Sequence, residues 1–260
     1  MKLVENISWE AQRVEEGKTT VRAVDRALDI LLCFTSGTDL AMTEIAEKVG
    51  LHKSTVHRLL ATLEEKGFLE RNPMTERYHL GLKVWELSAH LSRSDDPATL
   101  WLPEMERLRD QLGETVSIYV RDGMERIRIQ AVQSNQAVRR VAPVGARLPL
   151  YAGASSKVLI AFAAPDVQEQ ILNQKEWQTF VDNSLYRKQL EEIAAQGYAT
   201  SFEERETGAA AVSAPIMNRN GQLEAALSVS GPANRMTNEV MRDFGPVVAE
   251  AARRMGTMLR

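Results

Sequence analysis

The segment from Met42 to Gly81 most constrains the fold, because it joins two short helical patterns to two short apolar segments. Gly50 separates the helical patterns, as expected of a tight turn that needs backbone freedom. Gly67 follows the second pattern as a helix stop, and two segments that could pair as a hairpin come next. This order is typical of a winged helix-turn-helix, which reads double-stranded DNA.

The second of these helical patterns, about His52 to Lys66, has two distinct faces at 100° per residue. Valine and leucine cluster on one face, while small polar and basic residues begin the other. Such an N-terminal face suits the major groove, where hydroxyls hold phosphates and a long arginine reaches guanine edges. An ordinary solvent-exposed helix face is the alternative, but the turn before it and the hairpin after it favour DNA contact. The candidate DNA-binding residues are Thr43 in the preceding helix and Lys53, Ser54, Thr55, His57 and Arg58 in this one.

The hairpin is predicted from Phe68 to Leu80, with its turn at residues 72–75. The turn sequence is Asn-Pro-Met-Thr; proline fixes its own φ and asparagine can hydrogen-bond the local backbone. Arg71 and Arg77 flank the turn, where a wing would lie beside a phosphate backbone. We expect these arginines to position the domain on DNA rather than to read its sequence.

Net charge alone gives no sign of a nucleic-acid partner. The chain has 260 residues, a net charge of −3 and a hydrophobic share of 44%, which favours roughly two globular, soluble domains. Between Lys48 and Lys83, however, there are seven basic and four acidic residues. This modest basic patch fits specific DNA binding better than indiscriminate binding of polyanions.

Neither export nor membrane insertion is predicted, so we expect a cytoplasmic protein. The N-terminal residues are acidic where a signal peptide needs an apolar run, and no apolar segment could span a bilayer. The single cysteine, Cys33, lies in a helical apolar pattern and is interpreted as a small core residue. The four histidines lie in or beside the DNA-binding half, and we predict neither a metal site nor a cofactor.

Pattern and composition divide the chain into four parts. Residues 1–20 are polar and lack periodicity, and we expect a flexible tail. Residues 21–80 would form the DNA-binding domain. Residues 81–96 are helical by pattern, with Leu82, Trp85, Leu87 and Leu91 available for packing. Residues 97–260 would form a second domain.

The first helix of the DNA-binding domain is predicted over Val21–Phe34. Apolar residues recur there at a spacing of three and four, which is typical of an amphipathic helix. The residues with this spacing are Val21, Val24, Leu28, Leu31 and Leu32.

In the second domain, apolar residues alternate with other residues after Gly113, as they do in strands. A hairpin is predicted around Asp122-Gly123, and a further hairpin turn at Asn220-Gly221. Other strands are expected at residues 137–142, 209–217 and 223–230. Helices are expected at residues 98–112, 155–163, 167–174, 185–196 and 237–259. Strands joined by hairpins and interleaved with helices indicate an α+β domain with a largely antiparallel sheet.

Several segments resemble the IclR family of bacterial transcriptional regulators. The N-terminal half carries A-V-D-R-A-L-D-I-L, T-E-I-A-E-K-V-G-L, K-S-T-V-H-R-L-L-A-T-L-E-E-K-G-F-L and Y-H-L-G. The C-terminal half carries G-A-R-L-P-L-Y-A-G-A-S-S-K-V-L-I-A, E-E-R-E-T-G-A-A-A-V-S-A-P-I and A-L-S-V-S-G-P. Their order and spacing match the family from about Val21 onward. The resemblance implies a linker helix that contributes to dimerisation and a GAF-like, effector-binding C-terminal domain.

The resemblance also implies an effector pocket. Ala154 and Ser155 would begin a helix whose N-terminal amides could hold a carboxylate. Ser201 stands where many members have aspartate, and Ala211 where many have cysteine, so the detailed ligand contacts of relatives do not transfer. Arg140 is suited to a bidentate carboxylate contact, although a solvent-exposed arginine on a strand is the alternative. The implied pocket residues are Arg140, Leu148, Ala154, Ser155, Ser201, Ala209, Ala211, Ser228 and Ser230.

The sequence therefore predicts a regulator, dimeric or tetrameric, that binds a pseudo-palindromic operator in double-stranded DNA. A small-molecule effector, an organic or aromatic acid, would control binding and so govern a catabolic operon. An architectural DNA-binding protein is an alternative that leaves the C-terminal domain unexplained. A hydrolase is a second alternative, but Ala154 replaces the first serine that a Ser-x-x-Lys motif at residues 154–157 requires. No enzymatic activity is predicted.

Overall fold

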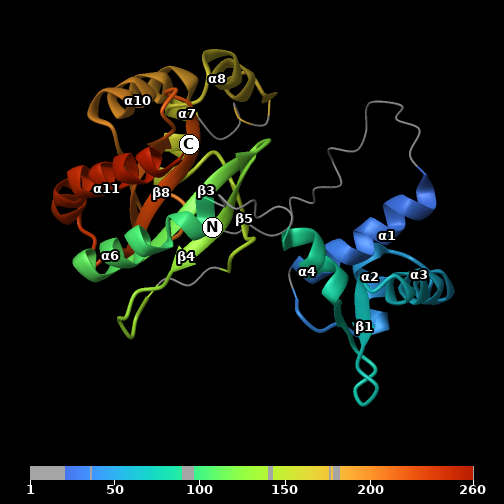
Figure 1. The fold of residues 1–260 in the computed structure, drawn as a ribbon. Coiled ribbons are helices and arrows are strands. Elements are labelled where there is room, and N and C mark those ends of the chain that lie inside the picture. The colour runs from blue at the N-terminus through green and yellow to red at the C-terminus, as the bar shows by residue number, and fades with distance from the viewer. Residues whose placement is uncertain are drawn as a thin grey trace. The chain divides into compact units, whose positions relative to one another are not determined.

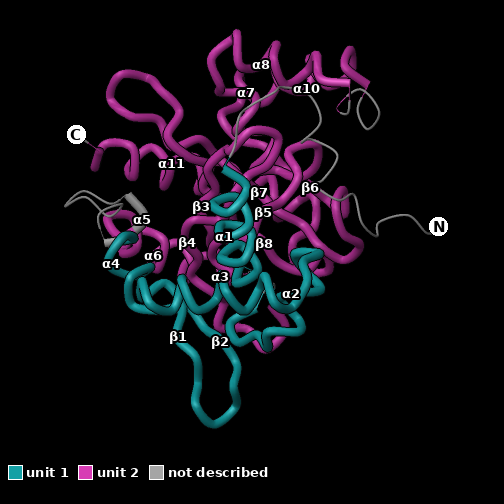
Figure 2. The backbone as a smooth tube through the Cα atoms, turned by 90° about the vertical axis from the view of Figure 1, so that its right-hand side faces the viewer, with its two compact units in different colours: residues 1–91 teal, residues 92–260 magenta. Residues whose placement is uncertain are grey.

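The computed structural model describes residues 21–35, 37–89, 97–139, 143–175, 177 and 182–259. The chain divides into two compact units, residues 1–91 and 92–260 (Figure 1, Figure 2). Within the described ranges, no helix combines the length and apolar character needed to cross a membrane. The predicted tail and Arg140 both lie outside the described residues.

The first unit contains helices and a two-stranded antiparallel sheet (Figure 2). Its elements are α1 (Arg22–Leu32), η2 (Cys33–Thr35), α2 (Met42–Val49), α3 (Lys53–Glu65), β1 (Leu69–Arg71), β2 (Tyr78–Leu80) and α4 (Leu82–Ala89). Leu69 pairs with Leu80 across the sheet, and Leu40 bridges to Tyr78 beside it. The predicted winged helix-turn-helix is confirmed.

One face of α3 packs into the core of this unit. Val56 and Leu60 are fully buried and belong to one apolar cluster with Ile45 of α2. Gly50 ends α2 with a φ of 63°, a left-handed conformation that glycine adopts without steric cost. The opposite, polar face of α3 is exposed, as its periodicity predicts.

The first helix buries a different face from the one its apolar spacing suggests. Its end and η2 contribute Ile30, Cys33 and Phe34 to the core. Cys33 is a core residue, as predicted, and burial raises the pKa of its thiol. Of the apolar residues singled out by spacing, Leu31 packs against the core, whereas the rest are exposed: Val21, Val24, Leu28 and Leu32. The spacing identifies a helix, but it does not decide which apolar side packs.

The second unit is built on a six-stranded sheet in the order β5-β4-β3-β8-β7-β6. Every neighbouring pair is antiparallel, which confirms the predicted α+β class. The strands are β3 (Thr115–Asp122), β4 (Glu125–Val132), β5 (Arg147–Pro149), β6 (Ala199–Phe202), β7 (Ala209–Met217) and β8 (Leu223–Pro232).

Helices cover both faces of this sheet (Figure 1). Residues of α6 (Leu102–Leu112) and α11 (Asn238–Met258) pack on one face, against Val212, Leu227 and Val229 among others. The other face meets α7 (Ala154–Ala161), α8 (Pro165–Leu172) and α10 (Asn183–Gln196). Because side chains alternate along a strand, β3, β7 and β8 supply apolar residues to both layers.

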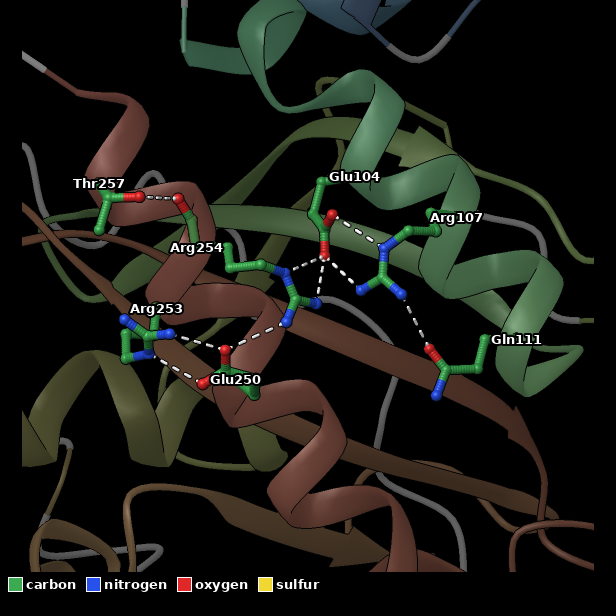
Figure 3. A network of polar contacts seen from close by, with 7 residues as sticks. All are labelled: Glu104, Arg107, Gln111, Glu250, Arg253, Arg254 and Thr257. Carbon is green, nitrogen blue, oxygen red and sulfur yellow. Dashed lines mark hydrogen bonds and ion pairs between the residues drawn. The ribbon is translucent and has the colours of Figure 1, made fainter.

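A polar network joins α6 to α11 (Figure 3). The Glu104 carboxylate accepts hydrogen bonds from Arg107 and Arg254, each with an N–O distance of 2.6 Å. Glu250 in turn pairs with Arg253 and Arg254. Burial alone would raise the pKa of the Glu104 carboxyl, but the hydrogen bonds from the two arginines outweigh burial and lower it. The network links two helices that are far apart in sequence.

Three local predictions need correction. The helix expected over residues 98–112 is two helices, α5 (Pro97–Leu100) and α6, because Pro103 cannot follow a continuous helical turn without a clash. Residues 137–139 form no strand, and residues 140–142 lie outside the described ranges. The short strands β5 and β6 were not predicted, since three or four residues are too few to establish alternation.

Candidate functional site

The N-terminal turns of α3 carry a polar, cationic surface. Lys53, Ser54, His57 and Arg58 are exposed, and Thr55 is half-buried. His52 caps the helix: its Nδ1 lies 2.8 Å from the Ser54 hydroxyl and accepts from the Ser54 amide at 3.4 Å. Neither lysine nor arginine of this surface forms an ion pair with a described residue. Both cations are therefore available to an external anion.

The wing carries the two predicted arginines in different settings. Arg71 pairs with Glu76 at 2.9 Å and is partly exposed. Arg77 donates to Glu44 at 2.7 Å and to the Asp39 carbonyl at 2.9 Å. These bonds attach the wing to the start of α2, so part of the guanidinium of Arg77 is already engaged within the unit. Contact between either arginine and DNA stays a prediction.

The turn of the wing is formed as its sequence predicts. The Asn72 side-chain oxygen accepts hydrogen bonds from the amides of Met74 and Thr75, at 2.9 and 3.2 Å. Thr43 is exposed on the first turn of α2.

A cavity in the second unit brings together the predicted effector residues. It lies between the sheet and the start of α7. Every predicted effector residue that the structure describes lines it: Leu148, Ala154, Ser155, Ser201, Ala209, Ala211, Ser228 and Ser230.

The cavity exists because small residues follow one another across the sheet. Ser201, Ala211 and Ser230 lie side by side on β6, β7 and β8, and each has too little volume to fill the layer. The alternate residues on the opposite face of β7 and β8 are larger, such as Val212 and Val229. One face is therefore densely packed and the other is hollow.

Two buried arginines on β4 complete the wall, and sequence analysis did not identify them. Arg126 and Arg128 are each 3% exposed. The sequence pattern could have identified them. Both arginines alternate with Ile127 and Ile129, so they must share the face of the strand opposite those isoleucines. The lining residues not predicted from sequence are Tyr119, Arg126, Arg128, Gly153, Arg205, Glu206 and Ala210.

Tyr119 on β3 lies close to both guanidinium groups. Its ring centre is 5.5 Å from the Arg126 guanidinium carbon and 5.4 Å from that of Arg128. Its hydroxyl accepts from Arg128 Nε at 3.1 Å. Burial lowers the pKa of Arg126 to about 10, which still leaves the group charged at neutral pH. The wall is thus cationic.

The start of α7 faces the same cavity. Gly153 caps this helix with a φ of 103°, and its amide donates to a Glu204 carboxylate oxygen at 3.2 Å. Glu204 also forms an ion pair with the buried Lys157. The amides of Ala154 and Ser155 come next and have no acceptor within the helix. Amides at a helix start and a nearby guanidinium are both suited to an anionic oxygen.

Comparisons with known proteins agree with this architecture. The family model for the bacterial transcriptional regulator IclR C-terminal domain matches residues 92–257, and that for the IclR helix-turn-helix domain matches residues 23–73. The HTH-type transcriptional regulator BhcR of Paracoccus denitrificans is 32% identical, over 90% of this chain and 86% of that protein. XynR of Escherichia coli is also 32% identical, over 89% of this chain and 94% of that protein.

Solved structures give the same result. The crystal structure of an IclR homolog complexed with 4-hydroxybenzoate, from Microbacterium hydrocarbonoxydans, is 27% identical with a TM-score of 0.79. The alignment covers 92% of this chain and 99% of that one. The chain therefore belongs to the IclR family of bacterial transcriptional regulators.

Proposed function

We propose that a small organic or aromatic acid binds in the cavity of the second unit and controls the affinity of the protein for its operator. The observation that best supports this proposal is the composition of the cavity. Buried guanidinium groups and the start of a helix line it, together with serine and alanine side chains of the sheet. Arg126 donates only to neutral acceptors. Because burying a cation without an anionic partner is unfavourable, an incoming carboxylate would be stabilised beside it.

DNA would be read by α3. In this proposal Arg58 contacts a guanine edge and Lys53 contacts phosphate, because both are exposed and without ion pairs among the described residues. Ser54, Thr55, His57 and Thr43 would contact DNA beside them. Arg71 and Arg77 would position the wing.

The protein would act as a homodimer or homotetramer on a pseudo-palindromic operator. Exposed apolar side chains support a self-contact in the first unit: Val24 and Leu28 on α1, and Leu82, Trp85 and Leu87 on α4. We propose that residues 81–96 link the DNA-binding domain, residues 21–80, to an effector and oligomerisation domain, residues 97–260.

Effector binding would favour one arrangement of the paired DNA-binding domains over another. Such control requires the acid to bind the two arrangements with different affinities. A neighbour of known structure was crystallised with 4-hydroxybenzoate, which supports an acid as ligand. In this proposal the protein regulates a catabolic operon. It acts in the cytoplasm, where the operator DNA lies.

An architectural role without an effector is the main competing function. A thermal-shift screen of organic and aromatic acids separates the two, because a ligand at a hundred times its dissociation constant stabilises by about 2.7 kcal/mol. We expect at least one acid to raise the melting temperature and to change operator affinity. An absence of any shift across the screen would contradict the sensor function. The relatives are named as regulators, and no enzymatic activity is proposed.

A further inference from the structure

We infer that the effector is a small dianion with two separated acid groups, such as a dicarboxylate. This inference rests on the proposed effector site and specifies its ligand. The cavity wall holds two arginines two residues apart on β4, and each has a different surrounding suited to one acid group.

Arg126 and the start of α7 form the first subsite. The hydrogen bonds from Arg126 reach only neutral acceptors, the carbonyls of Pro149 and Ala152 and the Ser156 hydroxyl. Its Nε is buried and has no partner. Gly153 allows this close approach, because a Cβ at that position would lie 3.0 Å from Arg126 Nη2. The guanidinium therefore lies beside the helix start, and one acid group there would meet both.

Arg128 forms the second subsite. Residues two apart on a strand are separated by about 6.6 Å and lie on the same face. Arg128 is also buried, and its Nε donates to the Tyr119 hydroxyl. Each guanidinium carbon lies within 5.5 Å of the Tyr119 ring centre, so both cations lie close to one aromatic ring. A short linker between two acid groups would span this separation.

The charge pairing around the cavity favours an acid group at Arg126. Three arginines and one glutamate line the cavity. Arg205 pairs with Glu206 at 3.3 Å, and Glu204 beside the cavity pairs with Lys157. These pairs compensate their own charges, whereas Arg126 has only the neutral partners described above. One acid group of a dianion would pair with Arg126 through strong, charge-assisted hydrogen bonds, and the other would lie on the side of the cavity that Arg128 lines.

The test compares ligands matched in length and differing in one acid group. Calorimetric titration of the full-length protein with succinate and butyrate, glutarate and pentanoate, and terephthalate and benzoate would be carried out at constant ionic strength. We expect the best diacid to bind at least about tenfold more tightly than its matched monoacid, since a hydrogen bond to a charged group contributes about 1.5–3 kcal/mol. Inorganic phosphate, which carries its charge on one centre, should bind more weakly than that diacid.

Two variants test whether the difference in affinity between a diacid and its matched monoacid comes from the second subsite. Arg128→Gln should reduce diacid affinity to within about threefold of the matched monoacid, with monoacid affinity nearly retained. Arg121→Gln is the matched control, because Arg121 lies on the same hairpin, is exposed and does not line the cavity; it should retain the diacid preference. The wild-type comparison does not depend on either variant folding.

The outcomes separate this inference from the function on which it rests. Equal affinity for diacids and monoacids, or phosphate binding as tightly as the best diacid, would overturn the two-subsite inference while leaving an acid sensor. Binding by none of these acids would overturn both. An undiminished diacid preference in a folded Arg128→Gln protein would show that Arg128 does not hold the second acid group.

Discussion

The cationic surface of α3 and the cationic wall of the cavity use similar residues in opposite settings. On α3, Arg58 is exposed while Leu60 beneath it is fully buried, so contact residues and core residues are different side chains. In the cavity, Arg126 is itself buried and bonds to the loop before α7. A residue of the first surface can change without affecting the fold, whereas a residue of the second carries both structure and binding.

The largest expected loss of stability comes from a core residue beneath the exposed surface of α3. Leu60→Ala should lower the free energy of unfolding by about 2–5 kcal/mol, because it leaves a cavity among fully packed side chains. Chemical denaturation followed by circular dichroism measures this loss. An unchanged denaturation midpoint would mean that α3 does not pack through this face.

Arg126→Ala tests whether a cavity residue also supports the fold. We expect a loss of about 2–3 kcal/mol in unfolding free energy, because the carbonyls of half-buried Pro149 and buried Ala152 would lose a donor. Thermal unfolding of the variant and of Arg126→Lys, which keeps a charge and some donors, measures it. Stability equal to wild type in the alanine variant would remove the contrast between the two surfaces.

Arg58→Ala should affect binding and leave stability unchanged. Operator affinity should fall by about 1–3 kcal/mol and base preference should relax if Arg58 reads a guanine. Fluorescence anisotropy measures affinity, and calorimetry should show intact effector binding. Lys66→Ala, at the other end of the exposed face, is the matched control. Loss of both activities in Arg58→Ala would indicate misfolding, and loss of neither would place DNA on another face.

The smallest effect concerns Glu104, a buried charge that has partners of opposite sign. Glu104→Gln should cost about 1 kcal/mol, because its arginine partners are partly exposed. Folding lowers the pKa of Glu104. Its stabilisation is therefore complete above the ordinary carboxyl pKa of 4.5 and is lost as the pH falls further. The unfolding free energies of wild type and Glu104→Gln, measured with urea, should converge as the pH is lowered. A difference that stays constant with pH would contradict this role.

Sequence patterns predicted the architecture wherever a pattern ran long enough. The face of α3, the wing turn at Asn72 and the long C-terminal helix follow from period and turn chemistry. Patterns failed where they were short, as in β5, or where two apolar sides competed, as in α1. Pro103 shows how one residue can divide a periodic segment.

The candidate site was predictable in part. The family resemblance placed Ala154, Ser228 and their companions in one cavity, because the motifs match position by position. It did not include Arg126 or Arg128, which depend on the alternation of this particular strand. The closeness of Tyr119 to both arginines depends on strand pairing, which no local pattern specifies.

Operator affinity measured with and without the acid shows whether the cavity controls DNA binding. Fluorescence anisotropy on an operator selected from random-sequence DNA would compare wild type with Ser228→Val, a substitution expected to fill the cavity. We predict that the acid changes wild-type affinity by about 5- to 150-fold and leaves Ser228→Val unchanged, with equal affinities before the acid is added. A wild-type affinity that the saturating acid does not alter, or an equal response in Ser228→Val, would contradict control through this cavity.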